Sequence, residues 1–173
     1  MKHIVILGST GSIGTNTLDI VDRFPEEFRV VGLTAGTNDE KLEAQIRKFR
    51  PAFAALANEA AAARLRDRCA DLPVKILAGN EGVAEVAQSQ EAELVISAIV
   101  GGAGLLPTLA AIRAGKQIAL ANKEPMVMAG ALMQAEAKKH HVRIFPIDSE
   151  HSAIFQSLEG HRREDVKRII LTA

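Results

Sequence analysis

Strand-like and helix-like segments alternate along the chain. Short runs of β-branched and apolar residues predict strands near residues 3–7, 29–34, 52–56, 74–77, 94–98, 116–120, 142–146 and 167–171. Segments with apolar residues at helical spacing predict helices near residues 12–23, 39–48, 59–70, 80–88, 104–114, 124–139 and 150–159. Alternation of this kind is typical of an α/β fold, in which a mostly parallel sheet carries helices on both faces.

A glycine-rich loop, residues 8–14, joins the first predicted strand to the first predicted helix. Gly8 would allow the tight turn, Gly11 would let the backbone approach a pyrophosphate, and Gly14 would let helix and strand pack closely. Free N–H groups at the start of the helix would bind the phosphates. The loop therefore predicts a Rossmann-like, doubly wound fold that binds a dinucleotide. Because the spacing is G-x-x-G-x-x-G rather than G-x-G-x-x-G, a glycine-rich turn without a ligand is the alternative.

The end of the second predicted strand bears on the choice of dinucleotide. An NAD site usually places a carboxylate there, on the adenosine ribose. This strand runs instead into Thr34-Ala35-Gly36-Thr37-Asn38, and Asp39 follows slightly too late. The missing acid favours NADP, although the nearest cation is Lys41 rather than a residue at the tip itself.

A second strand-to-helix junction carries Asn122, Lys123 and Glu124, followed by Pro125, which suits a first helical turn. Lys123 could hold an anionic substrate as a mobile point charge, and its two neighbours could position a cofactor ring or a hydroxyl. The alternative is a solvated helix cap with a weak surface ion pair.

A third junction places two carboxylates two residues apart, in Pro146-Ile147-Asp148-Ser149-Glu150-His151-Ser152. Ligands bind at the carboxyl ends of strands in α/β folds, and oxygen donors suit Mg²⁺ or Mn²⁺. The alternative is a helix N-terminus capped by Asp148 or Ser149, with Glu150 complementing the dipole. His151 is expected to be a polar surface residue, with a place beside the metal site as the alternative.

Composition excludes several functions. Lys+Arg and Asp+Glu both number 21, so a nucleic-acid footprint has no support, and without Trp or Tyr there is little for bases to stack on. Cys69 is the single cysteine, which favours a cytoplasmic protein with a buried structural thiol. No apolar run is long enough to predict a membrane span.

Three segments together resemble 1-deoxy-D-xylulose 5-phosphate reductoisomerase. They are Gly8 to Gly14, Ala121 to Glu124, and Pro146 to Gln156, and the similarity runs in order along all 173 residues. The resemblance implies an enzyme that rearranges 1-deoxy-D-xylulose 5-phosphate and reduces the resulting aldehyde with NADPH. The product would be 2-C-methyl-D-erythritol 4-phosphate, on the non-mevalonate route to isoprenoids.

The resemblance also implies a role for each candidate residue. The residues that would bind the cofactor are Thr10, Gly11, Ser12, Ile13, Gly36, Thr37, Asn38, Asn122 and Glu124. The catalytic residues would be Lys123, Asp148 and Glu150, of which Asp148 and Glu150 would hold Mn²⁺ or Mg²⁺. The substrate, a phosphosugar, would contact Lys123, Ser149 and Glu150.

Two departures from the family pattern qualify these implications. Position 37 is Thr, where the family commonly has Lys or Arg for the 2′-phosphate. The family's chain is also over twice as long, and its remainder carries a third acidic metal ligand and the site for the substrate phosphate. We therefore expect an NADP-binding domain at residues 1–145 and the start of a catalytic domain at 146–173, with cofactor binding but little turnover. Full-length family members are expected to be homodimers.

Two other classes of protein stay open. One is another Rossmann oxidoreductase, such as a semialdehyde dehydrogenase, which would need a cysteine nucleophile beside a base. Cys69, on an arginine-rich predicted helix, is poorly placed for that role. The other is a non-catalytic dinucleotide-binding module. No binding to nucleic acid or to a membrane is expected.

Overall fold

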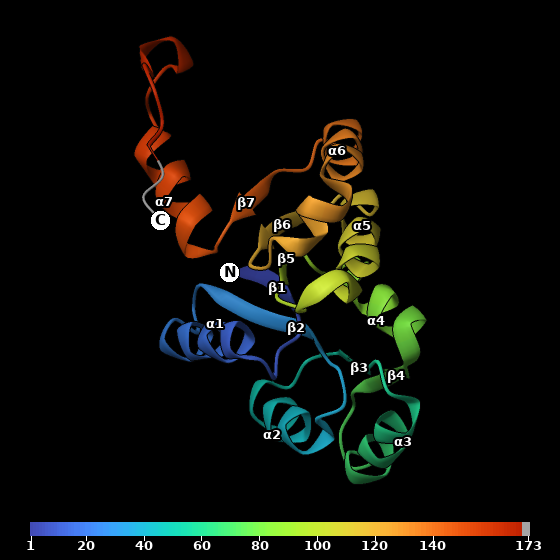
Figure 1. Cartoon of the computed structure of the whole chain (residues 1–173). Coiled ribbons are helices and arrows are strands. Elements are labelled where there is room, and N and C mark those ends of the chain that lie inside the picture. Colours follow the sequence, from blue (N-terminus) through green and yellow to red (C-terminus); the bar gives the residue numbers. More distant parts are fainter. Residues whose placement is uncertain (171–173) are drawn as a thin grey trace.

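The computed structural model describes residues 1–170, and a parallel sheet of seven strands runs through its centre (Figure 1). The strands are β1 (Lys2–Leu7), β2 (Phe28–Ala35), β3 (Phe53–Leu56), β4 (Lys75–Ala78), β5 (Leu94–Ser97), β6 (Gln117–Leu120) and β7 (Ile144–Pro146). Their order in the sheet is β4-β3-β2-β1-β5-β6-β7, and every adjacent pair is parallel. The predicted parallel sheet is therefore confirmed.

A helix follows each strand. The helices are α1 (Ser12–Arg23), α2 (Asp39–Phe49), α3 (Glu59–Arg68), α4 (Gly79–Ala87), α5 (Leu105–Arg113), α6 (Glu124–Lys139) and α7 (Ser149–Leu158), with short 3₁₀ turns at Gly101–Gly104 and Arg163–Asp165. Each of the first six has an apolar side that the sheet buries. Among the described residues no helix is long and apolar enough to cross a bilayer.

Two apolar cores lie on opposite faces of the sheet (Figure 1). Leu18 of α1, Leu42 of α2 and Leu65 of α3 belong to one core. Helices α4, α5 and α6 contribute to the other, through residues such as Val86 and Ile112. Side chains alternate along each strand, so one sheet fills both cores. Helices on both faces are the doubly wound arrangement that the sequence predicts.

The strand order reverses beside β1. From β1 the chain first builds outward through β2, β3 and β4, and then returns to place β5 on the other side of β1. In doubly wound sheets the crevice outside the carboxyl ends of two such strands is where ligands bind. The glycine loop follows β1, and the segment after β5 faces it across this crevice.

The last described part of the chain departs from the two-layer pattern. Helix α7 has no buried residue, and in Figure 1 it stands apart from the other helices. Phe155 of α7 meets Phe145 of β7 edge to face, with ring centroids 6.2 Å apart. The strand predicted at 167–171 is wrong for residues 167–170, which have no neighbouring strand to pair with; residue 171 lies outside the described residues.

Candidate functional site

The glycine loop packs as tightly as its sequence predicts. Gly8 has a φ of +80°, in the left-handed region that favours glycine, and its N–H donates to the carbonyl of Thr34 at the end of β2. A Cβ on Gly8 would lie 2.7 Å from the carbonyl oxygen of Ala98. A Cβ on Gly14 would lie 2.5 Å from the carbonyl oxygen of Gly8. Two glycines therefore let β1, β5 and α1 meet at one point.

The N-terminus of α1 is open to a ligand. Gly11 occupies the N-cap position, no side chain caps the helix, and its first turn carries no acidic residue. Helices α2 and α3, by contrast, are capped by side chains. Asn38 accepts a hydrogen bond from the backbone N–H of Lys41, and Asn58 accepts one from that of Ala61. The backbone N–H groups that open α1 are thus left for an anion, as a phosphate-binding loop requires. The structure places Thr10, Gly11, Ser12 and Ile13 together at this point.

The tip of β2 forms a second wall beside the loop. Gly36, Thr37 and Asn38 are all exposed there, and a Cβ on Gly36 would meet nothing within 4 Å. Helix α2 is held to the loop by Gln45, whose amide donates to the carbonyl of Ser9 at 2.9 Å. Loop and strand tip therefore enclose the position that the adenosine ribose takes in this fold.

The junction between β6 and α6 holds polar atoms without partners. Pro125 lies in the first turn of α6, as predicted, and Lys123 is the N-cap residue. The amide nitrogen of Asn122 and one carboxylate oxygen of Glu124 are buried and have no hydrogen-bond partner among the described residues. Buried polar atoms are rarely left unpaired, so these two atoms are available for hydrogen bonds with a ligand.

The junction between β7 and α7 follows the capping alternative only in part, since Glu150 does lie in the first turn of α7. Asp148 takes the N-cap position of α7, but its carboxylate makes no capping hydrogen bond. Its Oδ2 lies 2.5 Å from Nδ1 of His151, one turn along the helix. His151 is therefore more than a polar surface residue: it holds the candidate metal ligand. The sequence analysis did not predict this contact, although the spacing of three residues in a first helical turn is the signal that could have indicated it.

Glu150 is exposed and ionised. Its pKa is lowered, first by a hydrogen bond from Ser149 and then by its own backbone, with smaller contributions from the charges of Lys123 and His151.

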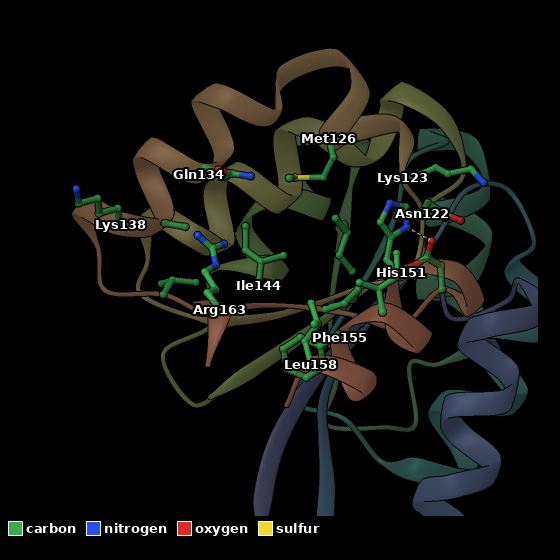
Figure 2. Close-up of a pocket in the computed structure, with 16 residues that line it drawn as sticks. Asn122, Lys123, Met126, Gln134, Lys138, Ile144, His151, Phe155, Leu158 and Arg163 are labelled. Carbon is green, nitrogen blue, oxygen red and sulfur yellow. Dashed lines mark hydrogen bonds and ion pairs between the residues drawn. The ribbon is translucent and has the colours of Figure 1, made fainter. Parts of the chain in front are cut away.

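A groove of about 860 Å³ joins the β6–α6 and β7–α7 junctions. In Figure 2, Asn122, Lys123 and His151 lie at one end of it, and Gln134, Lys138 and Arg163 lie toward the other. Its middle is apolar, with Met126, Ile144, Phe155 and Leu158 among the lining residues. The groove thus offers an apolar wall with polar groups at both ends.

The carboxylates fit a hard divalent cation only in part. Asp148 and Glu150 supply oxygen donors, and the side chain of Asp148 is 15% exposed, so its charge is partly shielded from water. No group of three or more His, Cys, Asp or Glu within residues 1–170 is arranged to hold a metal ion. Two carboxylates alone leave most of the six to eight positions around such an ion to water or to other ligands.

Cys69 has the properties of a structural residue. It follows α3, whose C-terminus lies at the edge of the sheet opposite the glycine loop, and it is 2% exposed. Burial raises the pKa of its thiol, and the charge of Glu43 adds to the rise. A buried, protonated thiol far from the loop does not serve as the nucleophile that a semialdehyde dehydrogenase needs.

Sheet order, helices on both faces and the glycine-rich first turn define a doubly wound α/β protein of the Rossmann type. A family model described as 1-deoxy-D-xylulose 5-phosphate reductoisomerase matches residues 4–130, and a model of that enzyme's C-terminal domain matches residues 144–173. The chain belongs to the 1-deoxy-D-xylulose 5-phosphate reductoisomerase family, which confirms the resemblance seen in the sequence.

Two relatives show how much of a family member this chain represents. The reductoisomerase of Chlorobaculum tepidum is 56% identical over 173 residues, which are 100% of this chain and 45% of the relative. That of Geotalea uraniireducens is 55% identical with the same coverage. The chain therefore spans about 45% of the length of these curated relatives.

Solved structures agree with the fold. The reductoisomerase from Zymomonas mobilis in complex with NADPH gives a TM-score of 0.91 at 40% identity, over 96% of this chain and 44% of that one. A reductoisomerase in complex with NADPH, fosmidomycin and magnesium gives a TM-score of 0.89 at 44% identity, over 92% of this chain and 40% of that one. A biliverdin reductase, with a TM-score of 0.54 at 16% identity, shares the fold alone.

Proposed function

We propose that this chain is the cofactor-binding part of an NADPH-dependent, divalent-metal-dependent reductoisomerase. The enzyme would convert 1-deoxy-D-xylulose 5-phosphate to 2-C-methyl-D-erythritol 4-phosphate in non-mevalonate isoprenoid biosynthesis. The observation that carries the proposal is that the candidate binding groups gather at one edge of the sheet. There the uncapped start of α1, the unpaired atoms of Asn122 and Glu124, and the carboxylates of Asp148 and Glu150 all lie at carboxyl ends of strands.

The chain's residues would bind NADPH along this edge. Thr10, Gly11, Ser12 and Ile13 would hold the pyrophosphate through backbone N–H groups. Gly36, Thr37 and Asn38 would flank the adenosine ribose, since they are exposed where β2 ends. Asn122 and Glu124 would receive the nicotinamide end, because their unpaired buried atoms then gain partners.

The substrate would bind at the β6–α6 and β7–α7 junctions. Lys123 would attract the anionic phosphosugar, and Ser149 and Glu150 would contact its hydroxyl groups. Asp148 and Glu150 would contribute oxygens to Mn²⁺ or Mg²⁺, with Asp148 oriented by His151. When bound, the cofactor supplies a hydride and the metal ion polarises the substrate oxygens.

The same proposal covers the organisation of the protein. Residues 1–145 would form the cofactor domain and residues 146–173 the start of the catalytic domain. The lack of any buried residue in α7 supports this division, because that helix has no core of its own in the described chain. The full-length protein would be a cytoplasmic homodimer.

A chimera tests the function. Residues 1–173 are joined to the part of the Chlorobaculum tepidum relative that lies outside the matched segment, and NADPH oxidation is followed with 1-deoxy-D-xylulose 5-phosphate and Mn²⁺. We expect the chimera to turn over and the 173-residue chain alone to show little or no activity. Asp148→Asn in the chimera should lower kcat/KM by about 100-fold or more, because metal ligation supplies several kcal/mol of transition-state stabilisation.

Asp67→Asn serves as the matched control, because Asp67 is an exposed acid on α3, outside the groove. A folded chimera that binds NADPH but turns over no substrate would contradict the proposal. So would full activity in Asp148→Asn. Robust turnover by the 173-residue chain would refute the expectation that it is incomplete.

A further inference from the structure

A lysine of α2, Lys41, reaches the adenosine end of the proposed cofactor site, although it does not belong to the tip of β2. Lys41, in the first turn of α2, extends its side chain across to the glycine loop, where Nζ donates to the carbonyl oxygen of Thr10 at 2.9 Å. The two residues are 31 positions apart in the chain. The ammonium group therefore lies against the loop after β1, one of the two walls of the proposed ribose position.

Lys41 forms no ion pair with a carboxylate in the described part of the chain, and it is exposed. Its Nζ carries three donors, of which the carbonyl of Thr10 takes one. Two donors and a full positive charge are thus available to a ligand at this point.

Asp39, the acid two residues before Lys41, is directed toward α3. The carboxylate of Asp39 lies 2.9 Å from Nε of Arg64 and 3.0 Å from a terminal nitrogen of Arg68. Glu40 acts on the same helix: the pKa of Arg64 is raised, mainly by its hydrogen bond with Asp39 and in smaller part by the charge of Glu40. The carboxylate of Asp39 is therefore held by two arginines, whereas Glu40 is exposed and has no ion pair in the described part of the chain.

We propose that Lys41 binds the 2′-phosphate of the dinucleotide and sets the preference for NADPH over NADH, a role that rests on the proposed binding of NADPH. Thr37 at the strand tip brings no charge, and Gly36 leaves open space beside it. A dianionic phosphate fits that space and completes the hydrogen bonding of the ammonium group. With Asp39 held by the arginines, that carboxylate is not free to bind the two hydroxyls of an NADH ribose.

Calorimetric titration of the 173-residue chain with NADPH and with NADH tests this assignment. Lys41→Gln keeps a donor for the carbonyl of Thr10 but removes the charge. We expect it to weaken NADPH binding by about tenfold or more, the range of a hydrogen bond to a charged group, and to change NADH binding by less than about twofold. Lys41→Arg should restore most of the NADPH affinity, because it restores the charge.

Lys48→Ala is the matched control. Lys48 lies in the last turn of the same helix and pairs with Asp22 at 2.8 Å. Its replacement should leave the affinities for NADPH and NADH unchanged. An unchanged NADPH to NADH ratio in Lys41→Gln would overturn the assignment while leaving the proposed function intact. Failure of the unaltered, folded chain to bind either dinucleotide would overturn both.

Discussion

At the scale of single residues, the carboxylate of Asp39 shows how a charge is withdrawn from the nucleotide site. The pKa of Asp39 is lowered, first by its hydrogen bond with Arg64, against an opposing effect of burial. Its side chain is 10% exposed, and a second arginine, Arg68, lies 3.0 Å from the same oxygen. Asp39 therefore stays ionised and bound to α3, and it contributes to joining α2 to α3.

A pH-dependent loss of stability is expected on removing this charge. The pKa of Asp39 is lower in the folded state than its ordinary value of 3.8, so the stabilisation is complete above that value and is lost as pH falls through the lower folded pKa. Asp39→Asn should lower Tm at pH 7 and at pH 5 by the same amount, and by progressively less below about pH 4.

Thermal unfolding followed by circular dichroism at pH 7, 5 and 3 measures this dependence. Asp67→Asn, an exposed acid on α3 for which no ion pair is found in residues 1–170, is the control and should show no such pattern. A difference between Asp39→Asn and the unaltered chain that stays constant down to pH 3 would contradict the account.

Which residue roles the sequence can predict depends on how local they are. The requirement for glycine at positions 8 and 14 follows from a strand that turns directly into a helix, and the structure confirms it through close backbone contacts. The partner of Asp39 lies 25 residues away on another helix, so no local pattern reveals it. The unpaired atoms of Asn122 and Glu124 depend on burial, which only the packed fold defines.

At the scale of secondary-structure elements, the periodicity of apolar residues and the turn residues suffice to locate all seven strands and all seven helices of the described chain. Their limits differ from the predicted ranges by a few residues. Strand β2 begins at Phe28 because it pairs with β1 from Lys2 onward, and β7 covers only Ile144–Pro146 because it lies at the sheet edge with one partner. Such limits depend on pairing and cannot be predicted from periodicity.

The close approach of α1 to its own loop makes Gly14 a stability determinant. In Gly14→Ala the new Cβ would lie 2.5 Å from two backbone atoms, of Gly8 and Ser9, which cannot move without shifting the loop. We expect the free energy of unfolding to fall by about 1–3 kcal/mol, the usual cost of overpacking. Urea denaturation of the purified chain measures it.

Gly11→Ala is the matched comparison. Its Cβ would come no closer than 3.4 Å to the carbonyl of Gly8, and the φ of −75° suits any residue. We expect its free energy of unfolding to change by less than about 1 kcal/mol, since a new N-cap preference and reduced unfolded-state entropy act in opposite directions. Equal losses in the two variants would show that the loop does not pack as described.

At the scale of the whole molecule, the alternation of elements predicts the doubly wound class, but not the order of strands. That order brings β1, β5, β6 and β7 side by side, so that four junctions far apart in the sequence meet at one edge. Lys123 and Asp148 line the same groove for this reason. The sequence predicts each junction; only the topology shows that they form one site.

The candidate metal site is incomplete within the described residues. Asp148 lines the groove and Glu150 lies outside its lining. Residues 1–170 offer no group of three metal-ligating side chains, and α7 has no buried residue. The proposed cofactor edge, by contrast, rests on β1, β2 and β6, whose residues toward the carboxyl ends are buried. We therefore expect this chain to bind a dinucleotide by itself but not to turn over substrate.

The most direct test is calorimetric titration of NADPH into the unaltered chain and into Gly11→Asp. Asp is a favoured N-cap residue, so the variant should fold, but its carboxylate would occupy the phosphate position at the start of α1. We predict binding to the unaltered chain and affinity at least about 100-fold weaker in Gly11→Asp, because juxtaposed like charges cost several kcal/mol. Absence of NADPH binding by the folded, unaltered chain, or equal affinity in the two proteins, would contradict the account.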